Sequence, residues 1–497
     1  MFWANFLHIY QPAEQTPDIL EAVSNQSYRL LLKGLKEHRK VRITLNVNGA
    51  LTELFDRFGY RDIIDDLRLL GREGRIEFTS SAKYHALLPF IPDEEVVRQI
   101  QVNDETNKFY LGDAYNPEGF FPPEMAYSER TPKLLEELGF KWLIIDEIAH
   151  KGETDSVNYN KIYQIKGTNL LAFFRYRRIS NLIMGAVVRS QKSFLDAVKD
   201  DLQNNRYLLT GMDGETFGHH RPGLEKSLFE IWDSPKVDLI KISEIPKYFH
   251  DVEIIEPLSS TWASSHDDIA RGVQFFSWAD PDNMIHRWQA DFVNFALRTV
   301  RTTEKSIPEY KEIRKKMDFA LASDQFFWAS AKPWWSLEMI VGGAYRLLDV
   351  IRSIPNVSHE ILEKALHMYE EIVSTAFVWQ QSGKIREMTK TQQSILRIPF
   401  KERTLEVGGE MQGDYYAFIE LMQKLEKKAA RNKEYEQAIL WRDAMYKIEN
   451  KLDIYDAMHV VDLLRLRVPH DEVEKLISKY REQYKHVRGG QPEQRGS

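Results

Sequence analysis

The stretch MFWANFLHIYQP at residues 1–12 indicates the architecture of the first half of the chain. Apolar side chains occupy both alternating faces of this stretch, with Trp3 and Leu7 on one face and Phe2 and Phe6 on the other. A strand that is apolar on both faces is typical of a parallel sheet that helices cover on each side. We therefore expect residues 1–12 to begin with an interior strand of an α/β domain.

Six further apolar runs have the same strand-like character, and helix-like segments separate them. The runs are VRITLNVNG (41–49), RIEFTSSAKY (75–84), GFFPPEMAYS (119–128), KWLIIDEIAH (141–150), RYLLTGMDGE (206–215) and VEIIEPLSS (252–260). Segments 26–38, 60–74 and 128–140 place apolar residues three and four positions apart, as amphipathic helices do. Because alternating strands and helices build parallel sheets, we expect an α/β catalytic domain over residues 1–280.

The character of the sequence changes after residue 280. Long segments rich in Ala, Leu, Glu, Lys and Arg dominate there, with the apolar spacing of amphipathic helices. Helices of this kind pack together as bundles. We expect a helical domain over residues 281–485 that contributes to the substrate cleft, followed by a polar, disordered tail at 486–497.

The charge composition argues against two classes of partner. The chain carries 67 basic and 74 acidic residues, so it lacks the basic excess that nucleic acid or an anionic membrane would attract. A neutral substrate is the natural expectation. The absence of cysteine excludes disulfides and thiolate metal sites. Because the amino terminus has no signal-peptide pattern and no apolar run reaches about 20 residues, we expect a cytoplasmic protein.

Two carboxylates follow predicted strands, Glu124 in GFFPPEMAYS and Asp213 in RYLLTGMDGE. Loops at the carboxyl ends of parallel barrel strands converge on one mouth, so two such residues can meet there. A pair of carboxyl groups is what glycoside hydrolysis requires. Taken singly, Glu124 fits a solvated loop carboxylate and Asp213 fits an Asp-Gly turn. The small residues Gly211 and Gly214 are predicted to leave room for a ligand.

Aromatic and histidine residues supply a second indication. Sugar rings stack on tryptophan, and Trp262, Trp278 and Trp328 lie among polar residues, although a protein core explains the clustered tryptophans beyond residue 320 equally well. A metal site is suggested by four residues, His219, His220, His266 and Asp267, but no known ligand spacing accompanies them. We therefore expect hydrogen-bonded histidines in a polar cleft, with no metal and no cofactor.

Five segments in order resemble the conserved regions of glycoside hydrolase family 57. They are LHIYQP (7–12), GRIEFTSS (74–81), GFFPPEMAYS (119–128), MDGETFGHH (212–220) and STWASSHDD through FFSWADPDN (260–283). The resemblance implies an incomplete (β/α)7 barrel followed by a C-terminal α-helical bundle, and metal-independent, retaining action on α-1,4-linked glucans. In this resemblance Glu124 matches the nucleophile and Asp213 the general acid/base.

The predicted sugar contacts surround this pair. The resemblance matches three residues to positions that line the sugar site: His8, Glu77 and Trp262. Further candidates are Tyr10, Gln11, Glu215, His219, Trp278, Asp324 and Trp328. Glu215 fits a second acid, a sugar ligand or a partner that raises the pKa of Asp213, and we favour the supporting role. Tyr10 stands where the family motif usually has a second histidine, and a phenol cannot be cationic at neutral pH.

The leading functional hypothesis is α-amylase-type hydrolysis of starch, glycogen or maltooligosaccharides. A 4-α-glucanotransferase or another α-glucan transglycosylase is the first alternative, because transfer differs from hydrolysis only in whether a sugar hydroxyl or water takes the glycosyl group. A non-catalytic glucan-binding protein is an alternative from another class. A metal-dependent deacetylase or mannosidase on a similar barrel is the last.

Overall fold

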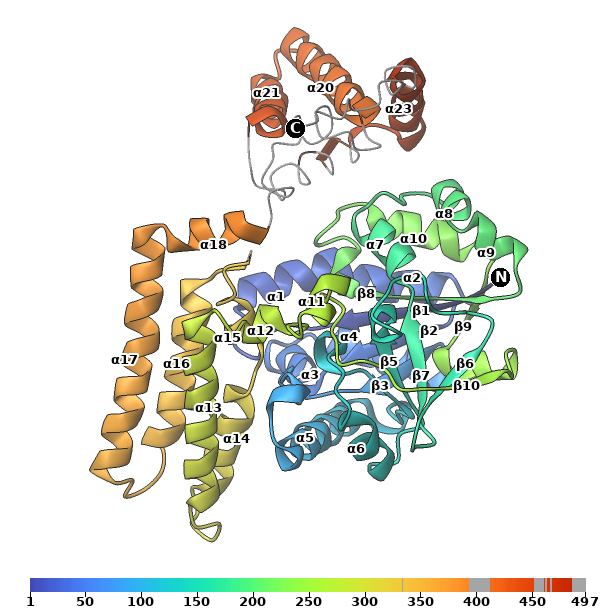
Figure 1. Ribbon diagram of the computed structural model, residues 1–497. Coiled ribbons are helices and arrows are strands. Elements are labelled where there is room, and N and C mark those ends of the chain that lie inside the picture. The colour runs from blue at the N-terminus through green and yellow to red at the C-terminus, as the bar shows by residue number, and fades with distance from the viewer. Residues whose placement is uncertain (333, 393–411, 451–459, 461–462, 465–466, 485–497) are drawn as a thin grey trace, which may run out of the picture. The chain divides into compact units, whose positions relative to one another are not determined.

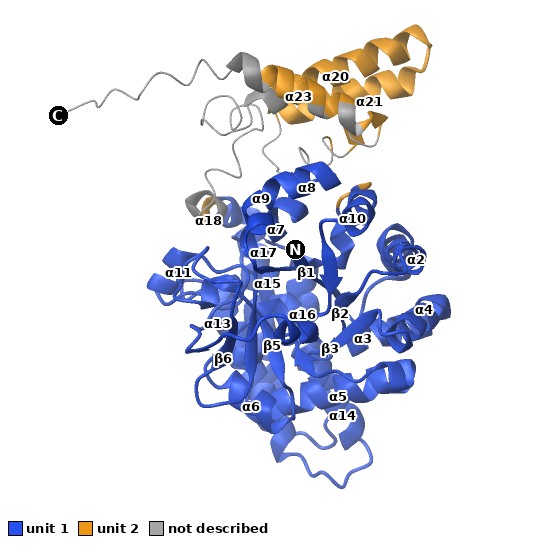
Figure 2. Ribbon diagram, turned by 90° about the vertical axis from the view of Figure 1, so that its right-hand side faces the viewer, with its two compact units in different colours: residues 1–220, 224–386 blue, residues 221–223, 387–497 orange. Residues whose placement is uncertain are grey.

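The computed structural model describes residues 1–332, 334–392, 412–450, 460, 463–464 and 467–484. The chain divides into two compact units, which Figure 2 distinguishes by colour. The first comprises residues 1–220 and 224–386, and the second comprises residues 221–223 and 387 onward. The predicted domain boundary at residue 280 therefore lies inside the first unit. The predicted tail at 486–497 lies outside the described residues.

A single sheet of ten strands forms the centre of the first unit (Figure 1). The strands are β1 (Phe2–Ile9), β2 (Ile43–Val47), β3 (Ile76–Ser80), β4 (Gly119–Phe120), β5 (Trp142–Asp146), β6 (Ile162–Ile165), β7 (Leu171–Arg175), β8 (Tyr207–Asp213), β9 (Asp238–Ile240) and β10 (Val252–Ile255). Their order is β10-β6-β7-β5-β4-β3-β2-β1-β8, and β9 pairs with β1. Neighbouring strands run parallel, with the exception of the antiparallel pair β6 and β7.

Seven of these strands make up a barrel, in the order β8-β1-β2-β3-β4-β5-β7. The two end strands of this set, β7 and β8, are not neighbours in the sheet order, but they approach each other. The amide of Tyr176, directly after β7, donates a 2.8 Å hydrogen bond to the carbonyl of Leu209 in β8. The predicted incomplete (β/α)7 barrel is confirmed, with its opening between β7 and β8.

Six of the seven predicted strands belong to this barrel, as β1 to β5 and β8. The seventh prediction, at VEIIEPLSS, corresponds to β10, which pairs with β6 outside the seven-stranded set. The remaining barrel strand is β7, a five-residue run LAFFR that the sequence analysis did not single out. A short apolar run carries no readable period, and its pairing with β5 is what identifies it as a strand.

The first strand is buried along nearly its whole length, because both of its faces are covered. Trp3 and Phe6, on opposite faces of β1, have no exposed surface. Trp3 packs against Phe194 with ring centroids 5.0 Å apart, and Phe6 packs against Phe121 at 5.1 Å. Burial of apolar surface on both sides anchors β1 at the centre of the sheet and so fixes the position of the polar residues that follow it.

Helices connect and cover the barrel strands. They are α1 (Pro17–Val23), α2 (Arg29–Glu37), α3 (Gly49–Arg57), α4 (Arg61–Arg72), α5 (Asp93–Leu111), α6 (Thr131–Glu137), α7 (Arg177–Met184), α8 (Gln191–Ala197), α9 (Lys199–Gln203) and α10 (Leu224–Trp232). The predicted helices at 26–38, 60–74 and 128–140 correspond to α2, α4 and α6. Helices α4 and α6 begin and end a few residues inside their predicted limits, as helix ends commonly do. Helix α2 instead continues from α1 through a π-helical turn at Ser24–Tyr28, so this helical segment begins before its predicted limit.

A second group of helices in the same unit lies beside the barrel (Figure 1). It consists of α11 (His266–Ala270), α12 (Phe276–Ala279), α13 (Met284–Thr302), α14 (Tyr310–Ala320), α15 (Asp324–Phe327), α16 (Leu337–Arg352), α17 (His359–Ser382) and α18 (Lys384–Gln392), the last of which runs past the unit boundary. Helix α16 packs against α13, α14, α15 and α17. The hydroxyl of Ser323, just before α15, donates a 2.6 Å hydrogen bond to the carbonyl of His85. This contact joins the helices to the barrel near the carboxyl end of β3.

The second unit has its own core. Its described helices are α20 (Gln412–Arg431), α21 (Tyr435–Asn450) and α23 (His470–Tyr484). Phe418, Met422, Trp441 and Ile477 belong to one buried cluster that these three helices share. Among the helices that the structure describes in either unit, none is long and apolar enough to cross a membrane.

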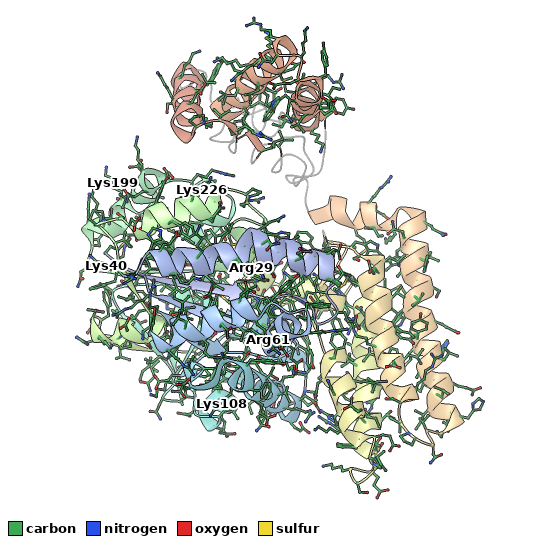
Figure 3. All side chains as sticks on the ribbon, turned by 180° about the vertical axis from the view of Figure 1, so that it is seen from behind. Arg29, Lys40, Arg61, Lys108, Lys199 and Lys226 are labelled. Carbon is green, nitrogen blue, oxygen red and sulfur yellow. The ribbon has the colours of Figure 1, made fainter. Side chains whose placement is uncertain are left out.

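Figure 3 labels several basic side chains around the barrel, among them Arg29 and Arg61. Arg29 of α2 lies 2.6 Å from Asp62, and Arg61 of α4 lies 3.1 Å from Asp56. Pairing of this kind neutralises the labelled arginines locally. Each of these two arginines therefore lies next to a carboxylate of opposite charge.

Candidate functional site

Asp213 is the last residue of β8, and the register of the sheet sets it beside His8 of β1. Both residues therefore stand at the carboxyl end of the barrel, where parallel strands present their functional side chains. Burial raises the pKa of Asp213 to about 6, and the positive charge of Arg175 opposes this increase. Asp213 is consequently a carboxyl group that titrates close to neutrality.

The two glycines near Asp213 serve close packing. A Cβ atom at Gly214 would lie 2.5 Å from Cγ2 of Ile9, and one at Gly211 would lie 3.0 Å from Cε of Met125. Other protein side chains already occupy the space beside these glycines. The prediction that they leave room for a ligand is therefore wrong, because neighbouring strands and loops pack against them.

Glu124 lies in the short turn Pro123–Met125 that follows β4, and its backbone is left-handed, with φ 62° and ψ 14°. Such a conformation costs a non-glycine residue about 1 kcal/mol or more and persists only where other contacts hold it. Trp262 provides two of them. Its backbone amide donates a 3.1 Å hydrogen bond to the carbonyl of Glu124, and its indole Nε1 donates a 2.7 Å bond to Oε2. Trp262 therefore holds both the backbone and the carboxylate of Glu124.

The carboxyl group of Glu124 is electrostatically coupled to Asp213. Burial, followed by the negative charge of Asp213, raises the pKa of Glu124 to about 8, while the hydrogen bond from Trp262 opposes the shift. The side chain of Glu124 retains 19% exposure, so it remains accessible to a small partner. Two carboxyl groups that influence each other in this way titrate as a pair. Of the two groups, Glu124 therefore holds its proton to the higher pH.

Glu215 is a third buried carboxyl group at this end of the barrel. Its Oε1 accepts hydrogen bonds from the phenol of Tyr28 and, at 3.1 Å, from the backbone amide of Tyr10. Burial and the charge of Asp213 raise the pKa of Glu215 to about 8. Gln11 reaches this group indirectly, through a 3.4 Å bond to the Tyr28 hydroxyl. These bonds tie Glu215 to the segment after β1, which favours the supporting role over that of a second catalytic acid.

Three neighbouring rings, those of His8, Tyr10 and His85, form an aromatic wall of the site. The rings of Tyr10 and His85 stack with centroids 4.3 Å apart, and those of His8 and His85 at 5.3 Å. Burial lowers the pKa of His8 to about 4 and that of His85 well below its usual value. Nδ1 of His8 bonds to Oδ1 of Asn46 at 2.8 Å. The wall is therefore polar but uncharged at neutral pH.

Tyr10 links this wall to the helices beside the barrel. Its hydroxyl donates a 2.7 Å hydrogen bond to Oδ2 of Asp324, the first residue of α15. Burial raises the pKa of Asp324, while the Tyr10 bond and the charge of Arg346 oppose the shift. The charge of Asp324 in turn contributes to the raised pKa of Glu124. A helical residue far along the chain thus shares the electrostatic environment of the carboxyl pair.

A buried ion pair lies beneath the carboxyl groups. The guanidinium of Arg175, at the end of β7, donates hydrogen bonds of 2.6 Å to the carbonyl of Gly211 and 2.8 Å to Oδ2 of Asp146. The side chains of Arg175 and Asp146 are 3% and 0% exposed. Arg175 also lies 5.9 Å from the ring centroid of Trp262. This pair joins β5, β7 and β8 below the site and supplies the positive charge that acts on Asp213.

Glu77 does not join this group of residues. It is the second residue of β3, whose carboxyl end lies three residues further along, about 10 Å at the usual rise per residue. Its Oε2 accepts hydrogen bonds from the Thr44 hydroxyl at 2.9 Å and from the amide of Ser243 at 3.3 Å. Glu77 therefore lies deeper in the barrel, toward the amino end of the strand, and apart from Glu124 and Asp213.

Three other predicted contacts have partners outside the carboxyl pair. His219 bonds to the side chain of Gln26 at 2.7 Å. Trp278 is 3% exposed and belongs to an apolar cluster with Leu87 and Ala126, as a core residue does. Trp328 is partly exposed, follows α15, and packs edge-on against Phe327.

Three residues near the carboxyl pair were not predicted from the sequence: His85, Arg175 and Arg346. His85 follows the predicted strand at 75–84 directly, so its position one residue past a strand was an available signal. Arg175 ends the strand that was not recognised. Arg346 lies in the middle of α16, where nothing in the local pattern distinguishes it from a solvated helix residue.

No group of three or more metal-ligating side chains gathers anywhere in the described ranges of the chain. Three acidic residues of the site, Glu124, Glu215 and Asp324, accept hydrogen bonds from indole, phenol and backbone amide donors. The chemistry available here is therefore that of paired carboxyl groups surrounded by neutral hydrogen-bonding and aromatic side chains.

Comparison with known proteins adds an independent observation. The sequence profile described as Glycosyl hydrolase family 57 matches residues 7–256. Alpha-amylase 1 of Dictyoglomus thermophilum is 26% identical over 219 residues, which is 43% of this chain and 31% of that protein. The 4-alpha-glucanotransferase of Thermococcus litoralis is 24% identical over 252 residues, 48% of this chain and 37% of that protein. Each match spans about a third of the relative's length.

Solved structures share the fold. The 4-alpha-glucanotransferase from Thermococcus litoralis superposes with a TM-score of 0.56 at 18% identity, covering 71% of this chain and 60% of that one. A branching enzyme from Thermococcus kodakaraensis superposes with a TM-score of 0.57 at 17% identity, covering 76% of this chain and 96% of that one. At these identities the similarity concerns the fold.

Proposed function

Because the chain belongs to glycosyl hydrolase family 57, we propose that it is a retaining enzyme acting on α-1,4-linked glucans, with Glu124 as nucleophile and Asp213 as general acid/base. The observation that carries the proposal is the coupled pair of half-buried carboxyl groups, whose pKa values of about 8 and about 6 lie on either side of neutrality. A double displacement needs one ionised and one protonated carboxyl group at the same pH. A pair that holds one proton meets that requirement.

The position of this proton matters for the mechanism. The higher pKa of Glu124 favours the proton on Glu124, whereas the proposed reaction needs it on Asp213. Two factors support the reactive arrangement. The indole of Trp262 stabilises the ionised form of Glu124, and positive charge that develops at the anomeric carbon stabilises the same form during attack.

The reaction then proceeds in two displacements. Glu124 attacks the anomeric carbon while Asp213 donates its proton to the departing glycosidic oxygen, so the glycosidic bond breaks and a glycosyl ester forms on Glu124. In the second step Asp213, now ionised, removes a proton from the incoming hydroxyl group, which attacks the anomeric carbon and releases Glu124. The neutral wall of His8, Tyr10 and His85 offers hydrogen-bonding groups and ring faces that suit a neutral sugar.

Hydrolysis of starch, glycogen or maltooligosaccharides is the leading form of this activity, and transfer to a sugar hydroxyl is the second. The relatives named above include an alpha-amylase and a 4-alpha-glucanotransferase, so both outcomes accompany this machinery. Incubation with maltoheptaose separates them. Products longer than the substrate would establish transfer, and products that are all shorter would establish hydrolysis.

Azide rescue tests the two carboxyl roles separately. We expect Glu124→Gly with azide and an activated α-maltosyl substrate to give the β-glycosyl azide, because azide replaces the nucleophile in a single displacement. Asp213→Gly should give the α-glycosyl azide, because azide then intercepts the ester on Glu124. The opposite pairing of anomers would reverse the two assignments.

Three further measurements test the acid/base role and the two other functional classes. Asp213→Asn should abolish turnover of intact glucan while the protein stays folded, and wild-type activity in this variant would refute the acid/base role. Glucan binding by the wild-type protein without release of reducing ends would support a non-catalytic protein. Turnover that survives exhaustive chelation would exclude metal-dependent deacetylase or mannosidase chemistry.

A further inference from the structure

A polar hollow lies far from the carboxyl pair, at the amino end of β8. It has a volume of about 580 Å³, and its lining includes Asn158, Asn160, Asn205, Arg206 and Tyr248. This volume falls within the range of roughly 300–1,000 Å³ that small-molecule sites occupy. Arg206 directly precedes β8, whereas Asp213 ends it. At about 3.3 Å per residue, the hollow and Asp213 are about 20 Å apart along the strand.

Backbone hydrogen bonds hold together the three segments that form the hollow. The amide of Tyr207 donates a 2.9 Å bond to the carbonyl of Tyr159, and the amide of Ile162 donates a 2.9 Å bond to the carbonyl of Asp251. The segments therefore keep a defined arrangement although they lie between strands. A preformed hollow loses little conformational entropy on binding.

Amide side chains give the hollow its chemistry. Asn158, Asn160 and Asn205 are exposed, and each carboxamide offers two donor hydrogens and an acceptor oxygen. A sugar hydroxyl both donates and accepts, so several amides around one hollow match a polyhydroxylated ring. Over the part of the chain that the structure describes, no protein group is bonded to the side-chain amides of Asn160 and Asn205.

The charge of the hollow points to a neutral ligand. The guanidinium of Arg206 pairs with Asp201 at 2.6 Å, which compensates its charge. The Nε of Arg206 is buried and has no hydrogen-bond partner among the described groups. Asp251 adds a carboxylate to the lining. A phosphate or another anion would meet no excess of positive charge here.

Tyr248 supplies an aromatic platform at the hollow. Its ring stacks on Phe2 with centroids 4.1 Å apart and planes inclined by 26°, so one face is supported from below. The residue is nevertheless 46% exposed. A supported, exposed ring beside hydrogen-bonding amides is the combination that a sugar ring recognises, since its C–H face stacks while its hydroxyls bond to amides.

We propose that this hollow is a second carbohydrate-binding site, in which a glucosyl ring of an α-glucan stacks on Tyr248 and bonds to the surrounding asparagine amides. The assignment of α-glucan as the ligand rests on the proposed function. The site is separate from the carboxyl pair, so binding there does not require turnover.

Calorimetric titration of maltoheptaose into Asp213→Asn tests this proposal without consuming the ligand. We expect two classes of site in this variant and one in Asp213→Asn with Tyr248→Ala, with at least about a tenfold loss of affinity at the second site. Tyr248→Phe should retain the second site, because the ring remains. Asn160→Ala should weaken it without affecting the fold.

Tyr345→Ala is the matched control, because Tyr345 is 49% exposed on α16. The proposal would be overturned if the titration showed a single class of site whose affinity does not change in Tyr248→Ala. It would also be overturned if Tyr248→Ala and Tyr345→Ala lowered the affinity for maltoheptaose equally. If the wild-type protein showed no turnover of glucan but bound it in a way that depends on Tyr248, the result would refute the proposed catalytic function and leave the second site standing. Turnover without such binding would refute the second site alone.

Discussion

The indole Nε1 of Trp262 donates a 2.7 Å hydrogen bond to Oε2 of Glu124, and the backbones of the same two residues are joined by a second bond of 3.1 Å. One residue thus holds the carboxylate and the left-handed backbone that presents it. The relationship explains how a glutamate in a strained turn keeps a defined orientation. It also favours the ionised form of Glu124, which is the form that attacks in the proposed mechanism.

Trp262→Phe should therefore lower kcat/KM by about 10- to 100-fold, because a hydrogen bond to a charged group contributes about 1.5–3 kcal/mol. The alkaline limb of the pH profile should also move to higher pH, since loss of the bond raises the pKa of Glu124 further. Initial rates on maltoheptaose across a range of pH measure both effects. Trp335→Phe is a suitable control, because Trp335 bonds to Gln380 instead. A kcat/KM within twofold of the wild type would argue against the role of Trp262.

The pH dependence of kcat/KM should be bell-shaped. The carboxyl pair holds one proton between its two pKa values, about 6 for Asp213 and about 8 for Glu124. Activity should fall below the lower value, where both groups are protonated, and above the higher value, where both are ionised. Rates on a neutral maltooligosaccharide would show an optimum near pH 7. A profile that stays flat from pH 5 to pH 9 would contradict the coupled pair.

Glu124→Gln should stabilise the protein more at high pH than at low pH. Folding raises the pKa of Glu124 from 4.5 to about 8, so the folded state binds more protons in this interval and loses stability as pH rises through it. Glutamine carries no charge and removes this penalty. We expect the increase in Tm to be small at pH 5 and at least about 2 °C at pH 8.

Asp62→Asn provides the opposite control for this experiment. The hydrogen bond from Arg29 lowers the pKa of Asp62, so folding favours the ionised form of this carboxyl group. Replacing Asp62 by Asn should therefore not raise the Tm at high pH. Thermal unfolding of both variants at the two pH values makes the comparison. An equal change in Tm at pH 5 and pH 8 for Glu124→Gln would refute the raised pKa.

Tyr10→Phe should keep the ring stack with His85 but remove the donor to Asp324. A buried carboxyl group left without this partner costs about 1–3 kcal/mol, so both Tm and kcat/KM should fall. Tyr10→His, which restores the usual residue of the family motif, should recover part of the activity if its imidazole donates to Asp324. Thermal unfolding and initial rates for the two variants measure these effects. A Tyr10→Phe protein that matches the wild type in both would show that the bond contributes little.

Local sequence does not show what packs beside a strand. The resemblance to family 57 matched Glu77 to a position that lines the sugar site, and the structure places it toward the amino end of β3, where it bonds to Ser243. Gly211 and Gly214 were expected to leave space, which Met125 and Ile9 fill. In each case the local pattern identified the strand correctly. The residues that pack beside that strand come from another part of the chain, so the local pattern does not reveal them.

The sequence by itself determined the series of buried strands and amphipathic helices, the polar residues that follow the strands, and the carboxyl groups Glu124 and Asp213, because period, composition and motif order are local properties of the chain. The tertiary structure alone decided that β7 completes the barrel, that Trp262 holds Glu124, and that Tyr10 bonds to Asp324. Trp262 and Glu124 are 138 positions apart in the sequence, and Tyr10 and Asp324 are 314 positions apart. No local pattern encodes such contacts, since they form only when packing of the whole unit brings distant segments together.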